Sequence, residues 1–138
     1  MDGGHSNWLE VNQAAELLKE SGIEMADGFT LNVSNFQSTE DLIKYGEELS
    51  ALLGGIPYII DTSRNGLGAD PSGEWCNPPG RGLGEQPGFV RDPNAPHLLA
   101  RAWIKPPWQS DGNCNGAPPA GEFYEEYIYL LYDNSPVF

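Results

Sequence analysis

Basic residues are scarce in this sequence. Only seven of the 138 residues are Lys or Arg, against 20 Asp or Glu, and the formal net charge is −13 at pH 7 with both histidines neutral. Binding to nucleic-acid phosphates or docking on an anionic membrane surface requires clustered Lys and Arg. Here the basic residues are scattered between Lys19 and Lys105. The composition therefore argues against nucleic acid and membrane as partners and favours neutral or cationic ones.

Long apolar runs are also missing. The sequence contains no run of about 18 apolar residues, the length that a transmembrane helix needs. The first ten residues, MDGGHSNWLE, have neither the positive leader nor the apolar segment of a signal peptide. We therefore expect neither a transmembrane helix nor an export signal within these residues.

Cysteine is limited to Cys76 and Cys114, which lie in the polar stretches EWCNPPG and GNCNGAPP. Free structural thiols usually lie in apolar surroundings, so the pattern favours a disulfide over two buried thiols without excluding the latter. A disulfide would imply an oxidising, extracellular setting. Two distant cysteines without a histidine pair make a poor zinc site, and no DxDxDG-type loop supports an acidic calcium-binding protein.

Glycine and proline are abundant, with 17 and 12 copies, about twice their ordinary share. They concentrate between Ser63 and His97 and again after Lys105, where we expect long shaped loops. The remaining sequence alternates helical and strand patterns. The spacing predicts helices over 11–21, 38–53 and 123–132, and strands over 28–33, 57–62 and 99–105.

This alternation indicates the α/β class, with a parallel sheet covered by helices. In such folds the loops after the carboxyl ends of the strands converge on one reactive face. Aromatic side chains beside carboxylates and amides are typical of sugar binding, because an indole covers the apolar face of a pyranose while polar groups reach its hydroxyls. The candidate residues at these positions are His5, Trp8, Asn35, Asp61, Arg64, Trp75, Lys105, Trp108, Gln109 and Asp111.

Six ordered blocks carry a specific resemblance: DGGHSNWL, DGFTLNVSNFQSTEDLIKYG, IIDTSRNG, GEWCNPPGRGLG, AWIKPPWQSDGNCNG and PPAGEFYEEY. Together they resemble the C-terminal half of the catalytic domain of glycoside hydrolase family 6, the cellulase family of endoglucanases and cellobiohydrolases. The resemblance spans nearly all of residues 1–138, with no second domain. It implies a partial distorted (β/α) barrel and hydrolysis of β-1,4-glucan with inversion, without metal or organic cofactor.

The resemblance also implies roles for individual residues. Asp111 in QSDG matches the proposed catalytic base of the family, and Arg64 and Lys105 match the cations around it. Two cations within about 4–6 Å favour the ionised form that a base needs. The alternative is that Asp111 is only a turn residue before Gly112.

Other positions match residues of the family that bind the glucan chain, namely His5, Trp8, Asn35, Trp75, Lys105 and Gln109. Cys76 and Cys114 match the pair that the family bridges. The chain departs from the family pattern KxPGESDG at KPPWQSDG, where Trp108 replaces a glycine and Gln109 replaces a sugar-binding glutamate. Trp108 either adds a stacking platform or narrows the cleft. The short spacing from Asp111 to Cys114 resembles the open-cleft endoglucanases, and we expect endo action.

In the family the general acid precedes the block that DGGHSNWL resembles, and no carboxylate of this sequence matches it. We therefore expect this chain to supply the base and much of the glucan-binding surface of a secreted enzyme. Three strands cannot close a barrel, so we also expect association with an N-terminal fragment or with a second copy, or else that the sequence is part of a longer one. The competing hypothesis is a non-catalytic glucan-binding fragment.

Overall fold

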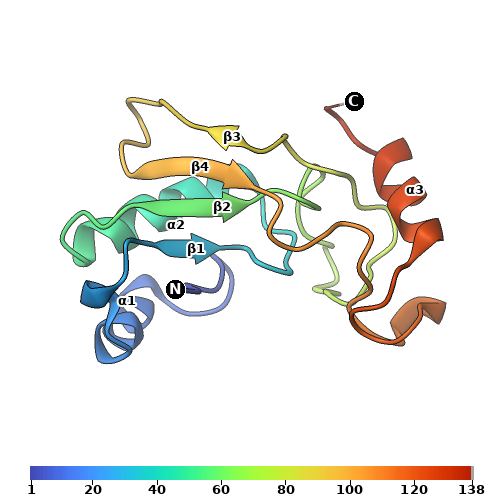
Figure 1. Cartoon of the computed structure of the whole chain (residues 1–138), viewed down its shortest axis with the longest axis horizontal. Helices are drawn as coiled ribbons and strands as arrows, with labels where there is room; N and C mark the ends of the chain where they lie inside the picture. The colour runs from blue at the N-terminus through green and yellow to red at the C-terminus, as the bar shows by residue number, and fades with distance from the viewer. Residues whose placement is uncertain (138) are drawn as a thin grey trace.

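The computed structural model of the chain describes residues 1–137. Helices and strands alternate along most of the chain, and Figure 1 shows the strands side by side with α1 and α2 packed against them and α3 set apart beyond the strand ends. The elements are α1 (Val11–Glu20), β1 (Phe29–Leu31), α2 (Thr39–Leu52), β2 (Tyr58–Asp61), β3 (Gly88–Phe89), β4 (Leu98–Ala102) and α3 (Glu125–Asp133), with 3-10 turns at Ile23–Met25 and Cys114–Gly116.

The sheet has the strand order β1-β2-β4-β3. β1 pairs with β2 in parallel, with Leu31 opposite Ile60, and β2 pairs with β4 in parallel, with Asp61 opposite Ala102. The predicted α/β class and the three parallel strands are confirmed, but the strand predicted over 99–105 ends at Ala102. The stretch 63–97 was expected to lack strands, and this is wrong at β3, which runs antiparallel to β4. Two residues are too few to show alternation, so only the pairing with β4 defines this strand.

Both N-terminal helices follow from local signals. α1 buries Ala14, Ala15 and Leu18 on one face and is followed by Gly22, whose φ of 82° is the left-handed conformation expected after a helix. α2 begins after Ser38, whose hydroxyl accepts a hydrogen bond from the backbone N–H of Asp41 at 3.2 Å. The helices predicted over 11–21 and 38–53 are thus confirmed to within one or two residues.

The main core lies between the sheet and these two helices. Phe29 and Tyr58 stack at 5.4 Å between ring centroids, and Tyr58 packs against α2 at Gly46, where a larger side chain would collide with its ring. The Tyr58 hydroxyl donates to Glu47 at 3.1 Å. The other face of the sheet carries the partly exposed Ile59 and the exposed Leu99, so one face only is covered by these helices.

A second, smaller core anchors α3 to the loop after β2. It consists of Leu83 from that loop and Tyr127 and Leu131 from α3. The hydroxyl of Tyr127 donates to the carbonyl of Pro78 at 2.9 Å. The parallel strands all point toward this region in Figure 1, so the segments that follow β2 and β4 meet there. Within residues 1–137, no helix has the length and apolar character required to cross a membrane.

Candidate active site

The residues that follow β2 and β4 bring three charged groups together. Arg64 lies three positions after β2, and Lys105 lies three positions after β4. Nη1 and Nη2 of Arg64 contact Oδ2 and Oδ1 of Asp111 at 2.7 and 3.0 Å, and Nζ of Lys105 lies 3.3 Å from Oδ1. The structure therefore places both predicted cations on the carboxylate of Asp111.

This cluster is shielded from solvent. The side chains of Arg64, Asp111 and Lys105 are 0%, 3% and 11% exposed. A two-pronged arginine–carboxylate contact is short and directional, and burial makes removal of either partner costly because the other charge stays desolvated. The arrangement fixes the Asp111 carboxylate in one orientation.

An aromatic ring completes the surroundings of Arg64. The guanidinium carbon lies 4.3 Å from the centroid of Phe36, a geometry that allows a cation–π interaction. Within the part of the chain that the structure describes, Nε of Arg64 is buried without a hydrogen-bond partner. The orientation of the Arg64 guanidinium therefore depends on its contacts with Asp111 and Phe36.

Asn77 also holds the Asp111 segment in place. Its backbone N–H donates to Oδ2 of Asp111 at 3.0 Å, while its Oδ1 accepts from the backbone N–H of Asp111 at 2.9 Å. Its Nδ2 also donates to the carbonyl of Gly112 at 2.9 Å. Asn77 is buried and has a φ of 44°, in the left-handed region that asparagine tolerates better than most residues. We name these mutual contacts the Asn77–Asp111 clasp.

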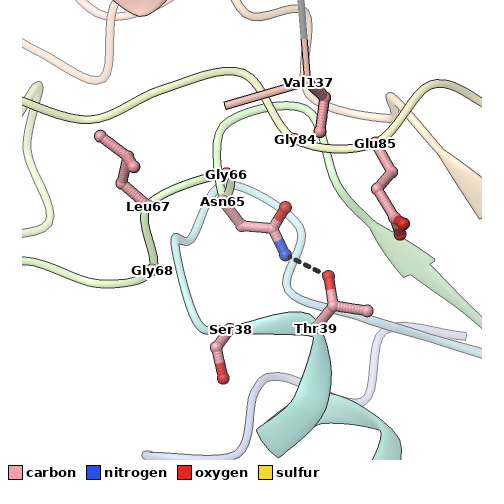
Figure 2. A pocket seen from close by; sticks show the side chains of 9 residues that line it. All are labelled: Ser38, Thr39, Asn65, Gly66, Leu67, Gly68, Gly84, Glu85 and Val137. Carbon is pink, nitrogen blue, oxygen red and sulfur yellow. Dashed lines mark hydrogen bonds between the residues drawn. The ribbon is translucent and has the colours of Figure 1, made fainter. Parts of the chain in front are cut away.

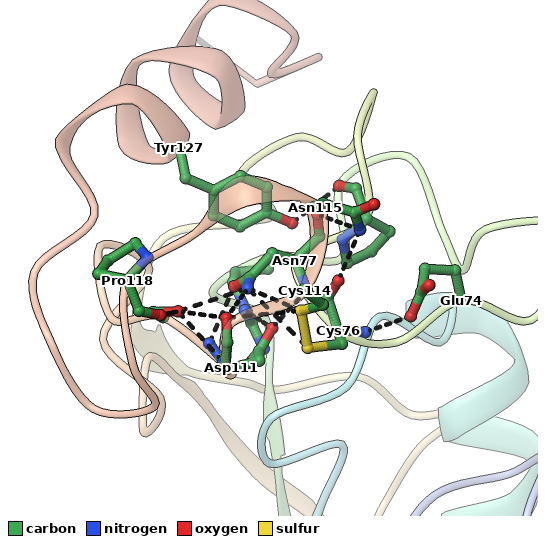
Figure 3. The surroundings of a disulfide bond; sticks show 12 residues. Glu74, Cys76, Asn77, Asp111, Cys114, Asn115, Pro118 and Tyr127 are labelled. Atoms are coloured by element: carbon green, nitrogen blue, oxygen red, sulfur yellow. Dashed lines mark hydrogen bonds and ion pairs between the residues drawn. A yellow bond between two sulfur atoms is a disulfide. The ribbon is translucent and has the colours of Figure 1, made fainter.

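A disulfide between Cys76 and Cys114 flanks the clasp, as Figure 3 shows. One cysteine precedes Asn77 and the other follows Asp111 by three positions, so the covalent bond ties the two segments of the clasp together. The predicted disulfide is confirmed, and it is consistent with an oxidising compartment.

Asp61 at the end of β2 connects the two loops. Its Oδ1 accepts from the backbone N–H of Ser63 at 2.9 Å, and its Oδ2 accepts from the backbone N–H of Lys105 at 2.8 Å. Burial raises the pKa of Asp61, while these hydrogen bonds and the nearby Arg64 oppose the rise. Both carboxylate oxygens hold backbone, so Asp61 positions Lys105 and is not directed at a ligand.

His5 and Trp8 lie in the turn before α1. Nδ1 of His5 accepts a hydrogen bond from the backbone N–H of Asn7 at 3.3 Å. Partial burial lowers the pKa of His5, and the negative charge of Asp2 opposes this shift. The indole of Trp8 is exposed and packs over Gly4, where its ring occupies the space that a larger side chain would need. Both aromatic groups are accessible enough to contact a ligand.

Asn35, Trp75 and Gln109 differ in their hydrogen bonds and exposure. The Oδ1 of Asn35 accepts from the backbone N–H of Phe36 at 2.9 Å and from Nε2 of Gln37 at 3.0 Å, so Asn35 shapes its own loop. Trp75 is exposed beside Cys76. Gln109 donates through Nε2 to the carbonyl of Gly121 at 3.2 Å. The roles assigned to these residues by resemblance stay predictions.

A pocket of about 420 Å³ is lined in part by the residues that follow Arg64 in the sequence, but Arg64, Lys105 and Asp111 do not line it. Figure 2 shows that the start of α2 and the backbone after Arg64 form its walls. Its lining residues are Ser38, Thr39, Asn65, Gly66, Leu67, Gly68, Gly84, Glu85 and Val137. Because Asp111 does not line it, we do not equate this pocket with the predicted glucan cleft. Within residues 1–137, no group of three or more His, Cys, Asp or Glu side chains is arranged to hold a metal ion.

Neither the contribution of Asn77 nor the bracing function of Asp61 is evident from the sequence. Asn77 lies in the string WCNPPG, where an asparagine before two prolines reads as an ordinary turn residue. Its partner is 34 residues away, and only the fold reveals the contact. The adjacent Cys76 was the one available signal, since a bridge to Cys114 would bring Asn77 close to Asp111.

Comparison with known proteins gives a consistent result. The family model described as glycosyl hydrolases family 6 matches residues 1–135. Endoglucanase A of Cellulomonas fimi is 49% identical over 135 residues, which is 98% of this chain and 29% of that protein. Endoglucanase 1 of Streptomyces halstedii is 41% identical over 138 residues, covering 95% of this chain and 41% of that protein.

A solved structure supports the fold. The endoglucanase Cel6 of Mycobacterium tuberculosis, in complex with methyl-cellobiosyl-4-deoxy-4-thio-β-D-cellobioside, superposes with a TM-score of 0.91 at 46% identity. The match covers 96% of this chain and 46% of that one. The sheet described above is therefore part of the distorted barrel of this group, and the chain spans about a third to a half of the relatives that it matches.

Proposed function

Since the chain belongs to glycosyl hydrolases family 6, we propose that it forms the base-bearing, C-terminal half of a catalytic domain that hydrolyses β-1,4-glucosidic bonds in cellulose or a related β-glucan with inversion. The observation that carries the proposal is the Asp111 carboxylate held by Arg64 and Lys105 at 2.7 to 3.3 Å. An inverting glycosidase needs one carboxylate that accepts a proton from water and one carboxyl group that protonates the leaving oxygen. Asp111 takes the first role.

The contacts of Asp111 define how water reaches it. A carboxylate has about four lone-pair sites, and those of Asp111 face two Arg64 nitrogens, the Asn77 N–H and Lys105. The Lys105 contact is the longest, and Lys105 is the more exposed of the two cations. Water therefore approaches on the Lys105 side, where a lysine can move aside while Arg64 keeps the carboxylate oriented.

The general acid is expected in the N-terminal half of the catalytic domain. The resemblance places that residue N-terminal to the block beginning at Asp2, so the complete reaction is proposed for the protein that joins both halves. The two carboxyl groups must then lie roughly 6.5–9.5 Å apart, with a water between the base and the anomeric carbon. Exposed Trp8 and Trp75 provide flat apolar surfaces for pyranose rings.

Endo action and secretion complete the proposal. The relatives that are 40–49% identical carry endoglucanase names. Cys114 follows Asp111 by three residues and is fixed by the disulfide, so this loop is too short to fold over a glucan chain. An open cleft suits attack within a chain. The disulfide also suits an extracellular enzyme.

Release of reducing sugar from soluble carboxymethyl cellulose tests the proposal, with Asp111→Asn as the decisive variant. We expect the substitution to abolish release by the protein that contains both halves. Asp133→Asn, which removes an exposed carboxylate at the end of α3, is the matched control and should leave release unchanged. Because Asp111→Asn unpairs the buried Arg64, thermal unfolding of each variant must accompany the assay.

The second candidate function, a non-catalytic glucan-binding module, rests on the exposed indoles of Trp8, Trp75 and Trp108. Binding of glucan with no release of reducing sugar, unchanged by Asp111→Asn in folded protein, would establish this function and overturn the catalytic one. Loss of release in a folded Asp111→Asn variant that still binds glucan would establish the catalytic function.

A further inference from the structure

A short antiparallel pairing brings Phe123 beside Gln109, just before Asp111 in the chain. The backbone N–H of Ser110 donates to the carbonyl of Glu122 at 2.9 Å, and the N–H of Tyr124 donates to the carbonyl of Trp108 at 2.8 Å. Gln109 and Phe123 therefore face each other as a bridge pair between these bonds. In such a pair the two side chains lie on the same face and approach closely.

Phe123 is held in an exposed position by a braced backbone. Its side chain is 63% exposed. The pairing is closed at its far end by the N–H of Gly121, which donates to the carbonyl of Ser110 at 2.9 Å, and α3 begins two residues after Phe123. Because this backbone is already fixed, covering the ring with a ligand costs no further ordering of the backbone, which favours binding.

Gln109 of this pair lies just before Asp111 in the chain. Ser110, between Gln109 and Asp111, is fully buried, and its hydroxyl donates to the carbonyl of Pro118 at 2.8 Å. Ser110 therefore anchors the segment that joins Gln109 to Asp111, while Gln109 itself stays partly exposed. An aromatic ring, a neutral carboxamide and the proposed base thus belong to one braced loop, with Gln109 two residues before Asp111.

We propose that Phe123 and Gln109 form a pyranose-binding subsite next to the base, with Phe123 as a stacking platform. This inference rests on the proposed function, since it assigns the ligand as a β-glucan. The ring of Phe123 covers the apolar C–H face of one glucose unit. One N–H of the Gln109 carboxamide donates to Gly121, which leaves its second N–H and its Oε1 for a sugar hydroxyl, and its neutrality suits a neutral ligand.

Calorimetric titration of the chain with cellohexaose tests the subsite. We expect Phe123→Ala to weaken binding roughly three- to tenfold, as for the loss of one aromatic contact. Phe123→Trp should retain the affinity or increase it. Phe89→Ala is the matched control, because Phe89 is also exposed, at 87%, but lies on β3 at an edge of the sheet. It should leave binding unchanged.

A fourth variant separates the subsite from the proposed function. Trp75→Ala removes an indole that the family resemblance, and not the Gln109–Phe123 pairing, assigns to glucan binding. If Trp75→Ala weakens binding while Phe123→Ala matches Phe89→Ala, the subsite is wrong and the proposed function stands. If the unchanged chain binds no cellohexaose, the subsite is wrong, and the release assay on the protein that contains both halves decides the proposed function separately. If Phe123→Ala alters sedimentation but not affinity, the ring contacts protein, and the subsite is again wrong.

Discussion

Asn77 and Asp111 exchange two hydrogen bonds across 34 residues of sequence, one from the Asn77 backbone to the Asp111 carboxylate and one from the Asp111 backbone to the Asn77 side chain. Each residue thereby fixes the other in position and orientation. The carboxylate that contacts Arg64 and Lys105 is therefore held through its backbone as well as through its charge.

Asn77→Ala is expected to lower the free energy of unfolding by about 2–4 kcal/mol. The substitution leaves the partly buried N–H of Asp111 without its acceptor and places alanine at a φ of 44°. Urea denaturation measures the change. Asn77→Gly loses the same side-chain hydrogen bonds without the backbone strain, so it should be the milder variant. Stability within about 0.5 kcal/mol of the unchanged chain for both would contradict the clasp.

Arg64→Met is expected to lower the free energy of unfolding by about 3–5 kcal/mol, because it leaves a buried carboxylate with Lys105 as its nearest cation. The exposed pair of Lys44 and Glu40 provides the control, and Lys44→Met should cause no measurable change. Replacing both members of the buried pair, as Arg64→Met with Asp111→Leu, should recover part of the loss. A double variant as unstable as the sum of the single ones would show that the two charges are not coupled.

The parts of the fold that local signals specify were predictable. The Ser38 cap, the glycine after α1 and the apolar strand YIID gave elements whose ends match the structure closely. The closing helix was predicted from Phe123, but α3 begins at Glu125 because Phe123 pairs with Gln109 instead. A competing contact distant in sequence decided that boundary, and no local pattern contains it.

The candidate site was predictable only through resemblance. The residues by themselves left Asp111 open as a simple turn residue, because an aspartate before Gly112 is ordinary in turns. The resemblance selected Arg64 and Lys105 as its neighbours, and the structure places them there. It did not select Asn77, whose contribution is a pair of hydrogen bonds formed only when the loops after β2 and β4 meet.

His5 should titrate below its ordinary pKa of about 6.5, because partial burial disfavours its charged form. Asp2→Asn keeps the oxygen that accepts the Gly4 N–H but removes the charge that opposes this shift, so it should lower the pKa of His5 further. NMR titration of the two histidines, assigned with a His97→Gln variant, measures both effects. An unchanged or higher pKa in Asp2→Asn would contradict the role of that charge.

The same shift has a defined effect on stability. Because the folded pKa of His5 lies below the unfolded one, the unfolded chain binds more protons in the interval between them. The contribution of His5 is therefore fully present above the unfolded pKa and is lost as the pH falls toward the folded pKa. A His5→Gln variant should show a weaker loss of stability across that interval, measured by denaturation at a series of pH values.

Replacing both cysteines by serine is expected to lower the free energy of unfolding by about 4 kcal/mol in the chain-entropy model, since the bond joins residues 38 positions apart. The effect should also be local. The disulfide joins the two segments of the Asn77–Asp111 clasp, so amide exchange at Asp111 should accelerate more than exchange in α2, whose amides serve as the internal control. Equal acceleration in both places would mean that the bond stabilises the whole fold without specifically holding the proposed base. Selective acceleration at Asp111, with the same result on reduction of the unchanged chain, would identify the bond as the element that keeps the carboxylate in register with Arg64.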